Sequence, residues 1–238
     1  MILPLRRPIA LLLLGVAAAG CHKSPPPAAV ESSVASGERA RRLALLTPPG
    51  GQPVDLLLRT LQDRARRDPQ KVDWWIALGQ SWVRKAREST DSGYYANARA
   101  CAEVALAIQP TSHLALDLQA QVLLNEHRFA EARDLARHTL ALRGDDVMAW
   151  GSLADALYEL GQLDEAEAAV QKMMELKPGL PAYSRASYLQ WVRGQSKAAK
   201  ESIRLAVDSA GAAARDPEPR AWAQWRSNGS SRFRWKRR

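Results

Sequence analysis

The chain has 238 residues, enough for one or two domains, and it is rich in Ala, Leu and Arg. This composition favours helices, and no set of segments shows the alternating pattern of strands, so we expect an all-α protein. The formal net charge of +9 does not by itself indicate a nucleic-acid-binding protein. Two of the positive charges precede residue 20 and six lie in the last fourteen residues, so the body between them is nearly neutral.

Residues 1–20 have the features of an export signal rather than of a folded element. Arg6 and Arg7 precede an apolar stretch that is too short to span a membrane, and small residues stand immediately before Cys21. Small residues followed by Cys resemble the lipobox of bacterial lipoproteins, which implies lipidation of Cys21 after cleavage. An ordinary secretory signal, cleaved after a small residue, is the alternative.

Residues 21–53 are rich in Pro, Ser and Ala and are predicted to form a disordered tether. Glu38–Leu46 can form a short helix between the two halves of this tether. The residue after Cys21 is His22 and not the Asp that retains bacterial lipoproteins at the inner membrane. The resemblance therefore implies an outer-membrane lipoprotein of the bacterial cell envelope that faces the periplasm. The second cysteine, Cys101, lies on an Ala-rich segment and is expected to be buried and inert.

Residues 54–71 contain one predicted amphipathic helix, Val54–Arg67, which Asp68-Pro69 ends. We interpret this segment as a half repeat that caps the array. Its last turn and the residues after it carry a basic patch, which is either a solvated face or a contact for anionic lipid or an acidic partner. The residues of the patch are Arg64, Arg66, Arg67 and Lys71.

Residues 72–211 contain an internal repeat, because His113–Gly144 and Val147–Pro178 coincide in residue class when one is shifted by 34 residues. Each segment is predicted to form two amphipathic helices joined by a short turn. A helix pair of this size cannot bury its apolar face alone, so the period predicts stacked copies, which form a solenoid. The recurring positions hold a bulky residue, Leu with a small residue, an aromatic residue or Leu, a turn Gly, Ala and a closing Pro: Trp150, Leu153, Ala154, Leu157, Gly161, Ala166 and Pro178.

These positions resemble the tetratricopeptide repeat signature. The resemblance implies a right-handed α-α superhelix of about four helix-turn-helix repeats. The segment Asp73–Pro110 is read as a first repeat with seven extra residues, which fall in Arg87–Tyr95. They form either a longer first helix with a polar turn or a loop that contacts a partner. Leu180–Gly211 is read as a fourth repeat that has lost one residue from the turn before it.

Residues 212–238 begin like a further first helix and end in a segment without acids. The helical pattern stops after Gln224, and Trp225, Phe233 and Trp235 then alternate with basic residues. One interpretation is an array truncated at this point, for example by a change of reading frame. The alternative is a basic-aromatic tail that binds anionic membrane or RNA. Because the body is nearly neutral, we do not expect nucleic acid as the main partner.

The sequence contains no pattern that indicates catalysis, a metal or a cofactor. Its four His residues lack metal-ligand spacing, and no Walker loop, nucleophile elbow or dinucleotide fingerprint is present. The acidic pairs Asp145-Asp146 and Asp164-Glu165 stand at predicted helix starts, where carboxylates interact favourably with the helix dipole. We therefore expect no enzymatic activity, no metal site and no cofactor.

Function is expected on the concave surface that first helices line in this repeat family. Aromatic side chains there are suited to protein recognition. The resemblance implies a membrane-anchored scaffold that binds a protein or peptide partner, and the oligomeric state stays open. The alternative is a substrate-presenting region of a larger enzyme. The 34-residue register places these residues in the groove: Gln80, Arg84, Asp117, Gln121, Asn125, Asp155, Tyr158, Glu159, Tyr188 and Trp191.

Overall fold

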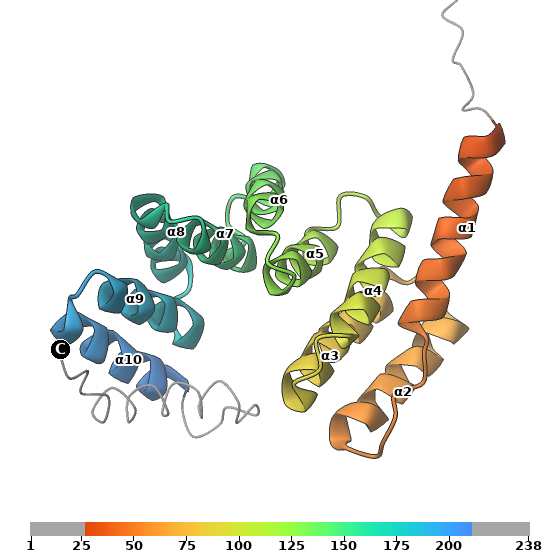
Figure 1. Cartoon of the computed structure of the whole chain (residues 1–238), viewed down its shortest axis with the longest axis horizontal. Coiled ribbons are helices and arrows are strands. Elements are labelled where there is room, and N and C mark those ends of the chain that lie inside the picture. The colour runs from red at the N-terminus through yellow and green to blue at the C-terminus, as the bar shows by residue number, and fades with distance from the viewer. Residues whose placement is uncertain (1–26, 211–238) are drawn as a thin grey trace, which may run out of the picture.

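The computed structural model describes residues 27–210, which form ten helices and no strand. Two helices come first, and eight more form four pairs that follow one another along an arc (Figure 1). The predicted all-α solenoid of four helix-turn-helix repeats is thereby confirmed. The elements are α1 (Pro27–Ala44), α2 (Pro53–Arg67), α3 (Val72–Ser89), α4 (Tyr94–Ile108), α5 (His113–Asn125), α6 (Phe129–Leu142), α7 (Val147–Glu159), α8 (Leu163–Leu176), α9 (Leu180–Val192) and α10 (Ser196–Ala210).

The helix bounds reproduce the period found in the sequence. Both helices of the third repeat, α7 and α8, begin and end 34 residues after α5 and α6. The helices of the fourth repeat, α9 and α10, begin 33 residues after α7 and α8. The difference lies in the turn before α9, which is one residue shorter than the turn before α7, as the sequence predicted.

The first repeat accommodates its seven extra residues mainly by lengthening its first helix. Helix α3 has 18 residues, whereas α5, α7 and α9 have 13 each. The turn after α3 and helix α4 take up the other two residues. Thr90 ends α3 in the left-handed conformation, with φ 54°, and α4 starts at Tyr94. Of the two readings, the longer helix with a polar turn is therefore the one observed.

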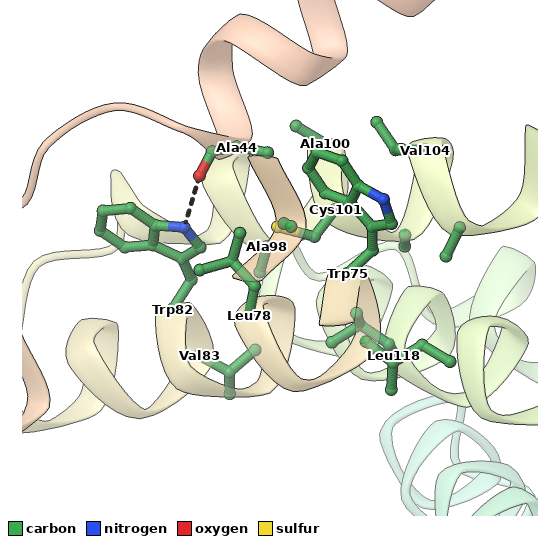
Figure 2. Close-up of a cluster of buried hydrophobic side chains, with 14 of the residues drawn as sticks. Ala44, Trp75, Leu78, Trp82, Val83, Ala98, Ala100, Cys101, Val104 and Leu118 are labelled. Carbon is green, nitrogen blue, oxygen red and sulfur yellow. Dashed lines mark hydrogen bonds between the residues drawn. The ribbon is translucent and has the colours of Figure 1, made fainter. Parts of the chain in front are cut away.

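Close approach of the two helices in each repeat depends on small residues. In the first repeat, Trp75, Leu78 and Trp82 of α3 are buried, and Figure 2 shows them beside Ala98 and Cys101 of α4. The second and third repeats bury the matching alanine pairs Ala120 with Ala132 and Ala154 with Ala166. In the fourth repeat, the Ser187 hydroxyl donates a 2.7 Å hydrogen bond to the Ala199 carbonyl. Small residues thus recur where the two helices of each repeat pack against one another.

Cys101 is fully buried and forms no disulfide. Burial raises the pKa of its thiol well above the ordinary value. The thiolate, which is the reactive form, is therefore suppressed, in agreement with the inert role expected from the sequence.

Helix α1 corrects the prediction of a tether over residues 21–53. Residues 27–44 are helical, and the short helix expected over Glu38–Leu46 is the last part of this longer one. Ala40 and Ala44 are buried in the same core cluster as α3 and α4. Trp82 Nε1 donates to the Ala44 carbonyl at 3.0 Å (dashed in Figure 2), and Asn97 Nδ2 donates to the Leu43 carbonyl at 2.7 Å. Contacts from residues distant in sequence therefore hold a segment whose composition alone indicates disorder.

Helix α2 packs on α3 and contributes a buried ion pair to this end of the array. Asp55 Oδ2 accepts a hydrogen bond from the Gln52 backbone N–H at 3.0 Å, which caps the helix start. Asp55 Oδ1 lies 2.8 Å from Lys85 Nζ of α3, and the Asp55 side chain is fully buried. Burial would raise the pKa of Asp55, but Lys85, the Gln52 N–H and Arg59 together hold it below its ordinary value.

The basic patch at the C-terminal end of α2 makes contacts within the chain. Arg64 Cζ and Lys71 Nζ each lie 4.9 Å from the centre of a Trp74 ring. Arg66 forms a 3.0 Å ion pair with Asp63. A solvated face and a contact for a partner both stay predictions for this patch.

The predicted signal at residues 1–20, the lipidation site Cys21 and the segment 212–238 lie outside the described residues. Within residues 27–210, no helix combines the length and the apolar character that crossing a bilayer requires.

Candidate partner-binding groove

The first helices of the four repeats form one row on the inner side of the arc. Helix α3 contacts α5, α5 contacts α7, and α7 contacts α9. No two of the second helices α4, α6, α8 and α10 are in comparable contact within the described chain. Helices on the inner side of a curved stack lie closer together than those on the outer side. The row of first helices therefore lines the concave face, as expected.

Three aromatic side chains lie in sequence on this face, where α7 meets α9. The ring centres of Tyr158 and Tyr188 are 4.5 Å apart with a tilt of 50°. Tyr188 and Trp191 are nearly parallel, at 6.3 Å and 14°. Trp191 is 60% exposed, which is unusual for so large an apolar side chain. The array presents an aromatic strip at this point and leaves its outer end open to solvent.

A charged pair crosses from one repeat to the next beside these rings. Arg185 of α9 donates two hydrogen bonds to Asp155 of α7, from Nε to Oδ1 at 2.8 Å and from Nη2 to Oδ2 at 2.6 Å. Burial alone would lower the pKa of Arg185, but Asp155 raises it above its ordinary value. A Cβ at Gly151 would lie 3.3 Å from Arg185 Cζ, so the glycine leaves room for the guanidinium. Both ends of the pair are thus held in fixed positions.

A small pocket of about 90 Å³ lies among these groups. Its walls come from both helices of the third repeat and from α9. The residues that line it are Ala154, Asp155, Tyr158, Glu159, Val170, Arg185, Tyr188 and Leu189.

Asp117 corrects the predicted groove, because its carboxyl group is buried instead of facing a partner. It is 7% exposed, and neither oxygen has a hydrogen-bond partner at normal distance. Burial is the main reason that the pKa of Asp117 rises to about 7, and the nearby Asp146 carboxylate adds to the rise. Asp146 itself caps α7 by accepting hydrogen bonds from the Met148 and Ala149 N–H groups. Asp117 therefore belongs to the junction between the second and third repeats.

Comparison with known proteins tests the fold inferred from these helix pairs. The family model for subunit 3 of the anaphase-promoting complex (cyclosome) matches residues 91–173. A thermophilic tetratricopeptide repeat protein of Thermus thermophilus superposes with a TM-score of 0.62 at 14% identity, over 82% of this chain and 96% of that one. The chain has the tetratricopeptide repeat fold.

A second solved structure, MamA from Desulfovibrio magneticus RS-1, has a TM-score of 0.50 at 19% identity and covers 73% of this chain and 94% of that one. No curated protein matches the chain. Identities this low establish the tetratricopeptide repeat fold and leave the partner open.

The fold brings together half of the residues predicted for the groove. Asp155, Tyr158, Glu159 and Tyr188 line the pocket, and Trp191 stacks beside it. The others lie on earlier tetratricopeptide repeats and do not reach the pocket. Of these, Gln80 and Arg84 are exposed on α3, Gln121 and Asn125 are half-buried on α5, and Arg84 forms a 2.6 Å ion pair with Glu88.

Arg185 is the one central residue that sequence reasoning missed. It stands three residues before Tyr188, which corresponds to Asp155 in the preceding repeat. A search for opposite charges near matching positions of adjacent repeats could have found the pair. Within residues 27–210, no group of three or more His, Cys, Asp or Glu side chains is arranged to hold a metal.

Proposed function

We propose that this chain is a scaffold that binds a protein or peptide partner through the concave face of its tetratricopeptide repeats, in the bacterial cell envelope. The observation that carries the proposal is the aromatic strip Tyr158–Tyr188–Trp191 beside a pocket on the inner row of helices, in which the two Tyr rings are half-buried and Trp191 is exposed. Large aromatic side chains that are exposed before binding and can be buried by it contribute most to recognition. A strip at one end of the groove would anchor a partner that extends along it.

Cross-linking and capture from envelope fractions tests this binding role. Trp191→Ala should lower partner recovery by roughly tenfold, because an exposed anchor is removed. The same change should alter the free energy of unfolding by only about 0.5 kcal/mol, since little buried area is lost. Leu205→Ala, on the second helix α10 and also partly exposed, is the matched control and should leave recovery unchanged. If the original chain and the Trp191→Ala variant recover equal amounts of partner, the strip is not the binding site.

The membrane anchor is the second part of the proposal, and it is supported by the sequence of residues 1–21 alone. In this proposal the lipid on Cys21 holds the array at the outer membrane on its periplasmic side. Cells that express the full chain should incorporate a labelled fatty acid into it, and Cys21→Ser should abolish the label and release the protein from membranes. Unlabelled protein of the original sequence in a soluble periplasmic fraction would support simple secretion.

A further inference from the structure

The pocket between α7 and α9 has the size of one side chain. Its volume of about 90 Å³ is well below the roughly 300 Å³ at which pockets for drug-sized ligands begin. A pocket of this volume matches the end of a single long side chain, such as one residue of a larger partner.

The charges around the pocket favour a cation. Asp155 is already neutralised by Arg185, which holds it through two hydrogen bonds. Glu159 is exposed and forms no ion pair with any cation in the described chain. One negative charge therefore remains at the rim. An acidic side chain would meet this charge, and Arg185 could not compensate, because its Nε and Nη2 donate to Asp155 and its Nη1 donates to the Pro181 carbonyl.

The rings supply a second attraction for the same kind of ligand. Tyr158 and Tyr188 line the pocket, and Trp191 extends the strip outward. The face of an aromatic ring attracts a positive charge, and a planar guanidinium also stacks on it. An apolar side chain could pack on the rings but could not pair with the Glu159 carboxylate. A basic side chain can contact the rings and pair with this carboxylate.

We propose that this pocket takes an arginine or lysine side chain of the partner, with arginine preferred, so that the partner is a peptide carrying a basic residue. The proposal rests on the peptide-binding function proposed above and names its chemistry. The basic group would lie in the pocket beside Tyr158 and Tyr188, with its charge toward Glu159. The negative charge of Glu159 at the rim favours a ligand that carries a positive charge.

The experiment begins with a displayed library of random peptides selected on the full chain. The selected peptides are synthesised with each arginine unchanged or replaced by citrulline, which has nearly the same shape and no charge. We expect citrulline at one position to weaken binding by roughly tenfold or more, as measured by fluorescence anisotropy. Lysine at that position should bind with intermediate strength.

The variant Glu159→Gln keeps the shape of the rim and removes its charge. It should weaken the arginine peptide several-fold and leave the citrulline peptide unchanged, which isolates the pairwise interaction. Glu201→Gln, an exposed carboxylate on α10, is the control and should affect neither peptide.

The two possible failures are distinguishable. If no peptide is enriched by the full chain, the proposed binding function fails and the inference with it. If peptides bind but citrulline or Glu159→Gln makes no difference, the groove binds peptides and the basic-residue pocket is wrong.

Discussion

Two buried carboxyl groups in this solenoid have pKa values shifted in opposite directions, because their neighbours differ. Asp55 lies beside Lys85 and its pKa is lowered, so it contributes stability above its unfolded pKa that is lost as pH falls through the folded value. Asp117 lies beside Asp146, and its pKa is raised to about 7. The folded state therefore holds a proton on Asp117 at pH values where the unfolded chain has released it.

The change Asp117→Asn tests this protonation state. Between the ordinary value near 3.8 and about 7, folding of the original chain takes up a proton, so its stability falls as pH rises and then levels off. Asn carries no charge, so this slope should disappear and the variant should be more stable at pH 8 by roughly 1–3 kcal/mol. Denaturant titrations at several pH values measure the difference. Asp208→Asn, an exposed control on α10, should keep the original slope. A persistent slope in Asp117→Asn would show that the carboxyl group titrates normally.

At the scale of helices, spacing within each repeat is set by small residues at recurring positions. Gly79 of α3 shows this most directly. A Cβ added there would lie 2.3 Å from Leu118 Cδ2, 3.0 Å from Cys101 Cβ and 3.4 Å from the Ala98 carbonyl oxygen. Leu118 Cδ2 ends a flexible side chain and can move, but Cys101 Cβ is fixed to the α4 backbone. Helices α3 and α4 would have to separate to admit the methyl group.

The change Gly79→Ala should therefore destabilise the chain. Alanine favours helices over glycine by about 1 kcal/mol, but overpacking typically costs about 1–3 kcal/mol, so we expect a net loss of up to about 2 kcal/mol. Gly37→Ala is the matched control, since Gly37 lies within α1 and has no atom within 4 Å of the added Cβ. It should be neutral or stabilising. Thermal unfolding of both variants measures the difference, and equal effects would mean that the α3–α4 spacing is not set by Gly79.

At the scale of the whole molecule, the core is divided into separate clusters along the array. One large cluster joins residues from α1 to α5, and a second joins residues from α6 to α9. A smaller cluster of Leu123, Ala132 and Ala156 lies between them, where α5, α6 and α7 meet. The pair α9–α10 has a separate small cluster formed by Ile203 and Ala206 with Leu180, Tyr183 and Val207. Stability of a solenoid is approximately a sum of repeat and neighbour terms, so these regions need not unfold together.

Native-state hydrogen exchange should therefore show a gradient along the chain. We expect amides of α9 and α10 to open with a lower free energy than those of α3 and α4, where Trp75 and Trp82 are both 1% exposed. The C-terminal end of α1 also packs on α3 and α4, and its hydrogen bonds to Trp82 and Asn97 further stabilise these two helices. A single opening free energy for all four repeats would show that the array unfolds as one cooperative unit.

The period, the pairing of helices within each repeat and the concave aromatic strip could be predicted from the sequence. Tyr158 and Trp191 stand 33 residues apart, one repeat after the other, so they share a face wherever the repeats stack. This works because each repeat contacts mainly its neighbours, and a register read from the chain therefore maps directly onto space. For the same reason, the seven extra residues of the first repeat and the residue lost before the fourth could be recognised in the sequence as interruptions of that register.

Tertiary structure alone decided which polar residues are buried and which segment docks. Asp117 and Gln121 occupy neighbouring turns of α5, yet Asp117 is buried while Gln121 is only half-buried, because the start of α7 with Asp146 lies beside Asp117. Composition predicted a tether where α1 docks, because the side chains that hold it, Trp82 and Asn97, lie about 40 and 50 residues further along the chain. Periodicity states which residues share a face, but burial depends on the side chains that neighbouring elements bring to that face.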